Sequence, residues 1–217
     1  MKIDAIKSRQ ILDSRGNPTI EVDVAVQKHI YRASVPSGAS TGSHEAVEAR
    51  DNKRAYHGKG VRTALQNIQK LAKKIQSKSF STQTQFDDFL LKQDGTPNKK
   101  RLGANALLAL SLAFARGHAG KKSLYADLAG LLKRPPALPL PFANVLNGGK
   151  HAGTPLKIQE FMVVPVGAKT FSEATQMVCE VYHSLKKEAV KKFGPSAGNV
   201  GDEGGIAPPP FKHAARP

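Results

Sequence analysis

The sequence of 217 residues predicts an α/β protein built in two parts, and three observations support that prediction. Apolar and polar residues alternate in TIEVDVAV (19–26), which is the period of a strand with one buried face. Residues 61–76 carry Leu, Ile and Ala at helical spacing. A proline-rich stretch, RPPALPLP (134–141), then precedes further short strands and a long helix.

The N-terminal part, residues 1–132, is predicted to begin as sheet and continue as helices. IYRASV (30–35) follows the first strand after a short connection, so we expect an antiparallel hairpin. DSRGNPT (13–19) is predicted to be a turn because Gly and Pro interrupt it. Helices are predicted over 61–76 and 101–116, and the second is apolar nearly all round, which indicates a buried helix.

The second part, residues 142–217, follows a linker predicted over 133–141, with the boundary near residue 137. FANVLNG (142–148) and QEFMVVPVG (159–167) are predicted to be short buried strands. A helix follows, with Thr170 and Glu173 as a capping box at its start and Gly194 at its end. Strand, helix and another short strand into GDEGG indicate the opening of an α/β layer or barrel.

The chain is strongly basic, with 33 Lys and Arg against 17 Asp and Glu and a formal net charge of +16. Such an excess fits nucleic acid, an anionic surface or an anionic substrate. Aromatic residues are only 6%, Trp is absent, and no zinc or recognition-helix motif accompanies the charge. We therefore interpret it as a solvated basic surface that attracts small anions, and we expect no nucleic-acid partner.

Several features favour a cytoplasmic protein without a membrane segment. The single cysteine, Cys179, excludes an intramolecular disulfide, and its apolar neighbours predict a buried or half-buried thiol. The first ten residues contain no apolar run, so we expect no secretory signal. The most apolar segment, residues 102–115, is too short to span a bilayer.

A glycine-bracketed loop, VPSGASTGSHEA (35–46), is the first stretch that could carry chemistry. Its backbone N–H groups and hydroxyls could bind phosphate or a metal-bound anion. It contains neither a Walker loop nor a dinucleotide fingerprint, and a flexible serine-rich turn explains the same residues.

The second candidate stretch combines NVLNGGKHAG (144–153) with the polar pair at 159–160. Paired glycines allow a close approach to a ligand, and His151 follows them, although a lone histidine is often structural. Gln159 and Glu160 stand at the head of an apolar strand, where they either end the strand in solvent or line a site.

The third candidate, GDEGG (201–205), places Asp202 and Glu203 side by side between glycines. Two carboxylates that share a site favour one protonated form, which suits a proton donor. An acidic surface turn would use the same residues, so the pattern alone leaves both interpretations open.

Taken together, these stretches resemble the enolase (phosphopyruvate hydratase) family. The resemblance covers residues 3–208 in the family's order and spacing. It implies an N-terminal α+β domain with an antiparallel three-stranded sheet and helices, followed by an enolase-type β/α barrel. The matching stretches are DSRGNPTIEV (13–22), VPSGASTG (35–42), EAVEARD (45–51), LGANALLALSLA (102–113), NVLNGGKHA (144–152), IQEFM (158–162) and NVGDEGGIAP (199–208).

The resemblance implies reversible dehydration of 2-phosphoglycerate to phosphoenolpyruvate, a step of glycolysis and gluconeogenesis. A lysine removes the proton next to the carboxylate, Mg²⁺ ions stabilise the dianion that forms, and a glutamate protonates the departing hydroxide. The expected partners are therefore 2-phosphoglycerate and phosphoenolpyruvate, the expected cofactor is Mg²⁺ with two ions per site, and the family also implies a homodimer.

By this resemblance Glu203 is the general acid. Glu160 matches the second catalytic glutamate, which positions the leaving hydroxyl. His151 and Gln159 match residues that contact substrate, and His151 is also implied in catalysis.

The loop at 37–40 resembles the family's lid over the substrate, and Ser40 is implied as a ligand of the second Mg²⁺. The region around Arg15 and Glu21 resembles part of the family's dimer interface. The lid residues implied to contact substrate are Ser37, Gly38, Ala39 and Ser40.

The resemblance ends at Pro208, and PPFKHAARP (209–217) matches nothing in the family. The catalytic lysine, the carboxylates of the first Mg²⁺ and the phosphate-binding arginine and serine would follow that point. We therefore expect the 217 residues to represent a truncated chain with an incomplete barrel, inactive by itself. A basic, non-catalytic binding module derived from the N-terminal domain is the alternative.

Overall fold

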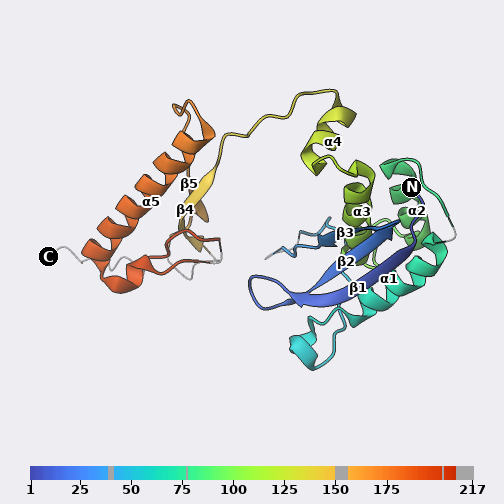
Figure 1. Ribbon diagram of the computed structural model, residues 1–217. Helices are drawn as coiled ribbons and strands as arrows, with labels where there is room; N and C mark the ends of the chain where they lie inside the picture. Colours follow the sequence, from blue (N-terminus) through green and yellow to red (C-terminus); the bar gives the residue numbers. More distant parts are fainter. Residues whose placement is uncertain (39–41, 77, 150–155, 202, 209–217) are drawn as a thin grey trace. The chain divides into compact units, whose positions relative to one another are not determined.

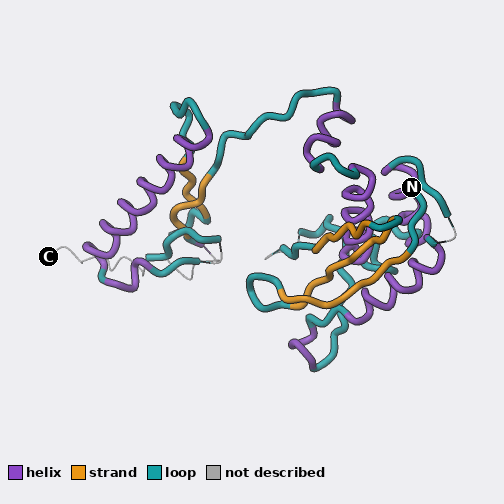
Figure 2. The backbone as a smooth tube through the Cα atoms, viewed as in Figure 1, coloured by secondary structure: helices purple, strands orange, loops and turns teal. Residues whose placement is uncertain are grey.

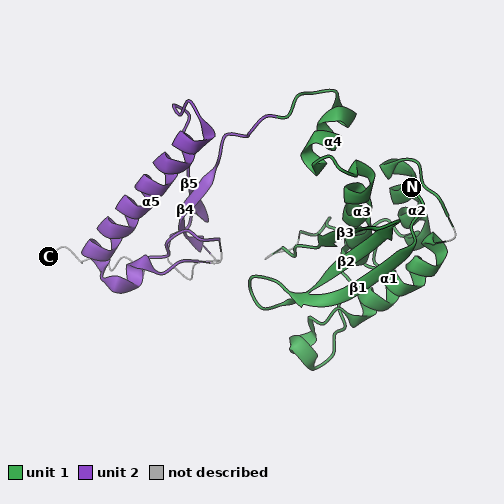
Figure 3. Ribbon diagram, in the orientation of Figure 1, with its two compact units in different colours: residues 1–136 green, residues 137–217 purple. Residues whose placement is uncertain are grey.

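The computed structural model describes residues 1–38, 42–76, 78–149, 156–201 and 203–208 (Figure 1). The chain divides into two compact units, residues 1–136 and residues 137–217 (Figure 3). The division lies within the proline-rich stretch, whose residues 134–142 form neither helix nor strand (Figure 2).

The first unit contains a three-stranded antiparallel sheet in the order β1-β2-β3. The strands are β1 (Ala5–Leu12), β2 (Pro18–Val26) and β3 (His29–Ser34). The predicted hairpin is confirmed, with Val24 opposite Tyr31 in the register. The alternation in β2 also holds, because Ile20, Val22 and Val24 are fully buried on one face.

Helices cover the apolar face of this sheet. The two that contact it are α1 (Arg62–Ile75) and α3 (Ala104–Ala119), whereas α2 (Gln83–Asp94) and α4 (Leu124–Leu132) contact α3. A short 3-10 turn, η1 (Ala55–Gly58), precedes the helices. α1 contacts β1, and α3 contacts β2 and β3 (Figure 1). The two predicted helices are confirmed as α1 and α3, although α3 begins three residues later than expected, after Gly103 with φ +98°.

The core of the first unit lies between the sheet and the helices, and aromatic rings fill its centre. Phe86 of α2 and Phe114 of α3 are fully buried and stacked, with ring centroids 4.2 Å apart. Phe80 meets both rings edge-on, at 5.0 and 6.1 Å. α2 was not predicted because Phe86 and Leu90 are its only buried apolar residues, so its sequence lacks a clear apolar stripe.

The second unit contains β4 (Ala143–Asn147), β5 (Glu160–Val163), α5 (Phe171–Phe193) and the 3-10 turn η3 (Pro195–Gly198). β4 and β5 pair antiparallel. An isolated parallel bridge joins Leu146 of β4 to Ile206, which follows α5 in the sequence. The strand predicted at GDEGG is therefore reduced to isolated bridges of Ile206 with Leu146 and Val200. The prediction of a buried β5 was wrong, since Phe161 and Met162 are exposed.

α5 has the predicted caps. The Thr170 hydroxyl accepts a hydrogen bond from the Glu173 backbone N–H at 3.1 Å, and the Glu173 carboxylate accepts one from Lys169 N–H at 2.7 Å. Only Ala174 and Ala189 of this helix are buried. Cys179 is exposed, so the predicted buried or half-buried thiol was wrong; Met177 and Val181, two of its apolar neighbours, are exposed as well.

Among the described residues, no helix is both long and apolar enough to cross a membrane.

Candidate active site

The GDEGG segment forms a tight turn that presents Glu203. Gly201 N–H donates to Gly205 C=O at 2.9 Å, and Gly204 has φ +82°, a conformation that glycine adopts without strain. Tyr182 of α5 holds the turn from outside, because its hydroxyl donates to Gly204 C=O at 3.1 Å. Glu203 is exposed at the tip, while Asp202 lies outside the described residues.

Two asparagines of β4 lie behind the Glu203 carboxylate. Asn147 Nδ2 donates to Glu203 Oε2 at 3.2 Å, and Asn144 Nδ2 reaches the same oxygen at 3.5 Å. Asn147 is buried, with an exposed fraction of 1%. Sequence analysis did not assign a role to these residues, although two amides three residues apart in an apolar strand are an unusual pattern.

Glu160 reaches the same end of the small sheet through strand pairing. It is the first residue of β5 and the register partner of Asn147, the last residue of β4. The predicted catalytic glutamates are thus both neighbours of Asn147. Gln159 precedes Glu160 and donates from Nε2 to Glu160 Oε1 at 3.4 Å.

The paired glycines after β4 are explained by close backbone packing. Gly148 N–H donates to Gln159 C=O at 2.8 Å, and a β carbon at residue 148 would lie 2.2 Å from Ile158 C=O. Gly149 has φ +61°. His151 follows this turn in sequence but lies outside the described residues.

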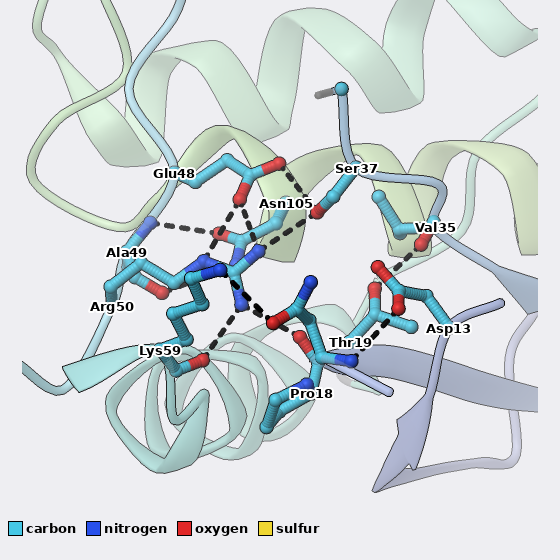
Figure 4. Close-up of polar contacts among 12 residues, drawn as sticks. Asp13, Pro18, Thr19, Val35, Ser37, Glu48, Ala49, Arg50, Lys59 and Asn105 are labelled. Atoms are coloured by element: carbon cyan, nitrogen blue, oxygen red, sulfur yellow. Dashed lines mark hydrogen bonds and ion pairs between the residues drawn. The ribbon is translucent and has the colours of Figure 1, made fainter. Parts of the chain in front are cut away.

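The first unit holds the root of the predicted lid through Ser37, Glu48 and Arg50 (Figure 4). Ser37 Oγ donates to Glu48 Oε1 at 2.9 Å and accepts from Arg50 Nη2 at 2.8 Å. Arg50 also donates to Glu48 Oε2 and to the carbonyls of Pro18 and Lys59. The hydroxyl of Ser37 is therefore engaged in a fixed network, which suits an anchor for the loop.

Arg15 also contacts the root of this loop. Its Nη2 donates to the carbonyls of Ser37 and Gly38, at 2.8 and 3.3 Å. Asp13 accepts backbone N–H bonds from Asn17 and Arg15, and these bonds, helped by the Arg15 guanidinium, lower the pKa of Asp13 below its ordinary value. Ala39 and Ser40 lie outside the described residues.

A cavity of about 1290 Å³ lies beside this loop root within the first unit. Arg15, Ser37, Gly38, Glu48 and Asn105 are among its lining residues. Ser37 and Gly38, the two described residues of the loop predicted to contact substrate, therefore border a hollow rather than packed core.

Glu21 belongs to a different cluster, on the face of the sheet opposite the core. Arg9 bonds both Glu21 and Asp23, and Arg32 donates to Asp23 at 2.7 Å. The hydrogen bonds from Arg32 and then Arg9 hold the pKa of Asp23 well below its ordinary range. Arg15 and Glu21 were both assigned to the predicted dimer interface, but their contacts within this chain belong to separate clusters.

The described residues contain no group of three or more His, Cys, Asp or Glu side chains that could hold a metal ion. Ser40, the predicted ligand of the second Mg²⁺, is not among them.

Two protein-family models match the chain. The model of the enolase N-terminal domain matches residues 3–126, and that of the enolase C-terminal TIM barrel domain matches residues 135–214. The chain belongs to the enolase family. It is 51% identical to the enolase of Pyrococcus furiosus over 211 residues, which cover 96% of this chain and 49% of that enzyme. It thus spans about half the length of this enolase relative.

Proposed function

We propose that this chain supplies the acid side of an enolase active site, for the reversible dehydration of 2-phosphoglycerate to phosphoenolpyruvate. One observation carries the proposal. Glu203 and Glu160, from segments about forty residues apart, both adjoin Asn147 at one end of the β4–β5 sheet. Two carboxyl groups gathered at a strand end form a suitable setting for proton transfer.

In the proposed reaction a base, the lysine that the resemblance places after residue 208, removes the proton from carbon 2, and the electron pair of that bond forms the double bond between carbons 2 and 3. The bond between carbon 3 and the hydroxyl oxygen breaks, and the oxygen keeps the electron pair of that bond. Hydroxide is a poor leaving group, so Glu203 transfers a proton to that oxygen, water departs, and Glu203 is left as a carboxylate. Glu160 positions the leaving hydroxyl. Gln159, His151 and the loop from Ser37 to Ser40 contact the substrate.

Mg²⁺ is part of this proposal through the family, in which it stabilises the charge that develops on the substrate. The roles given above to Glu203, Glu160, Gln159, His151 and the loop concern only side chains and backbone of this chain.

The proposal also includes a homodimer and a cytoplasmic location. The charged cluster around Glu21 lies on an outer sheet face and supports a role in subunit contact, whereas Arg15 contacts the lid root. Sedimentation of the purified chain tests for the dimer, and the Glu21→Ala variant tests for the contribution of this face.

A chimaera tests the proposed activity. Residues 1–208 of this chain would be joined to the remaining part of the Pyrococcus furiosus enolase, which is half identical to it. We expect the chimaera to form phosphoenolpyruvate, and we expect Glu203→Gln to lower turnover about 100-fold or more because the proton donor is lost. Asn199→Ala, at an exposed asparagine, should leave turnover unchanged.

Two outcomes contradict the proposal: a folded chimaera without activity, or a Glu203→Gln variant as active as its parent. We further expect the 217-residue polypeptide by itself to form no phosphoenolpyruvate, because the resemblance places the catalytic lysine and the metal carboxylates after residue 208. Formation of phosphoenolpyruvate by the purified polypeptide with Mg²⁺ would refute this expectation.

The alternative is a basic binding module without catalysis, for which the net charge of +16 is the supporting observation. Retention on nucleic acid that survives physiological ionic strength and falls with added salt would favour it. We expect no such retention, since few aromatic residues accompany the charge.

A further inference from the structure

Asn147 is a buried polar residue whose side chain is only half satisfied. Its Nδ2 donates to Glu203 Oε2 at 3.2 Å, while its Oδ1 and that of Asn144 are buried without a hydrogen-bond partner among the described residues. A buried amide with one unpaired atom destabilises a fold relative to an apolar side chain of the same shape. The hydrogen bond to Glu203 explains why a buried amide, rather than an apolar side chain, occupies position 147.

The glycines of the GDEGG turn fit around these two amides. A β carbon at residue 205 would lie 2.4 Å from Asn147 Oδ1 and 3.0 Å from Asn144 Oδ1. Gly205 is therefore required by close approach to the asparagines. At residue 201 a β carbon would lie 3.3 Å from Asn147 Oδ1, which is also tight.

The backbone holds Asn147 and the turn in a fixed relation. Asn147 N–H donates to Ile206 C=O at 2.9 Å, and Ile206 N–H donates to Val145 C=O at 3.0 Å. Ile206 itself is fully buried. The amide thus meets the carboxylate from a paired strand rather than from a free loop, as accurate positioning requires.

We propose that Asn147, supported by Asn144, is a positioning residue that fixes the Glu203 carboxyl group by Oε2 and directs its transferable proton to Oε1. Both amide donors point to Oε2, and a carboxylic acid accepts hydrogen bonds better through its carbonyl oxygen than through its hydroxyl oxygen. The protonated acid therefore keeps Oε2 as the carbonyl. Among the described residues no hydrogen bond reaches Oε1, so that oxygen is open to the substrate.

The role in proton transfer rests on the proposed function, but the contact can be tested without turnover. In the full 217-residue chain, NMR would follow hydrogen exchange of the side-chain amide of Asn147, assigned by its loss in Asn147→Leu. We expect it to exchange about tenfold or more slowly than the amide of exposed Asn199, a factor that corresponds to about 1.4 kcal/mol.

Variants at Glu203 separate positioning from burial, and because this residue is exposed they should fold. Glu203→Ala should speed exchange of the Asn147 amide about tenfold. Glu203→Gln, which keeps a carbonyl acceptor, should restore part of the protection. Neither variant should alter the Asn199 amide. From the other side, Asn147→Leu should shift the carboxyl ¹³C resonance of Glu203, whereas Asn199→Ala should not.

The proposal is overturned if Glu203→Ala leaves exchange of the Asn147 amide unchanged, or if that amide exchanges as fast as that of Asn199. If the Asn147→Leu chain fails to fold, the side-chain amide of Asn147 is assigned through its own backbone resonances instead, and the Glu203 variants still decide the test. If the chimaera needs Glu203 but the NMR contact is missing, the acid stands and its positioning by Asn147 is wrong. If the folded chimaera is inactive but the NMR contact is present, the contact between Asn147 and Glu203 stands and the proposed enolase activity is wrong.

Discussion

The two units bury their longest helices to very different extents. In the first unit, eight of the 16 residues of α3 are buried, including Phe114 and Leu110. In the second unit, α5 has 23 residues, of which only Ala174 and Ala189 are buried. Met177 and Val181 belong to its apolar stripe and are exposed.

This difference shows where each unit obtains its stability. The first unit closes an apolar core between its own sheet and helices. The second unit has a small cluster of Ala189, Ala197 and Ile206, and it belongs to a barrel domain, in which strands and helices pack against neighbours around a ring. The candidate acid Glu203 therefore lies in the unit with the smaller apolar core.

The largest expected effect is on independent folding. A polypeptide of residues 1–136 should unfold cooperatively, whereas one of residues 138–217 should unfold broadly and bind an apolar dye, because exposed strand edges and apolar faces disfavour a unique fold. Circular dichroism during heating and dye fluorescence would measure both. A sharp transition of 138–217 without dye binding would show that the second unit is autonomous.

A matched pair of truncations probes the two helices within the full chain. Phe114→Ala should lower the free energy of unfolding by about 3–5 kcal/mol, because it opens a cavity beside Phe86. Met177→Ala on α5 should cost less than about 1 kcal/mol, because the side chain is already exposed. Urea unfolding measures both values, and similar losses would contradict the contrast between the helices.

The charged cluster of the first unit should make stability depend on pH. Asp23→Asn should lower the free energy of unfolding by about 2 kcal/mol near neutral pH, because hydrogen bonds from two arginines lose a charged acceptor. Since the folded pKa of Asp23 is lowered, this stabilisation is fully present above the unfolded pKa of about 3.9 and is lost as the pH falls toward the folded value.

The difference in stability between parent and Asp23→Asn should therefore shrink below about pH 4. The control is Asp88→Asn, at an exposed aspartate of α2, which should change stability little at either pH. A difference that stays constant from pH 7 to pH 3 would exclude Asp23 as the titrating group.

The smallest expected effect concerns the start of α5. Thr170→Ala removes the hydroxyl that accepts from Glu173 N–H and should destabilise the helix by about 1 kcal/mol. Thr175→Ala in the helix interior should be neutral or slightly stabilising, because alanine is the better helix former. Hydrogen exchange of the first-turn amides measures both changes, and equal protection in the two variants would exclude a role for the cap.

The sequence by itself predicted the features that depend on neighbouring residues. The alternation in 19–26, the spacing in 61–76, the capping box at Thr170 and the glycine turn around Glu203 all reflect local backbone and side-chain preferences. Together with the family resemblance they named Glu203, Glu160 and Gln159. Helix α2 was not predicted because its apolar residues show little helical periodicity. The predicted burial of Cys179 was wrong because burial of a side chain depends on segments that are distant in sequence.

Only the tertiary structure decided which side chains meet. It brought Asn147 to Glu203 across 56 residues of sequence, placed Glu160 opposite the same asparagine, and turned Arg15 toward Ser37 and Gly38. No local preference specifies such contacts, because strand register and the packing of separated segments determine them together. The sequence therefore determined the elements with clear local patterns and, with the resemblance, the candidate acid, whereas the fold determined which side chains lie beside that acid.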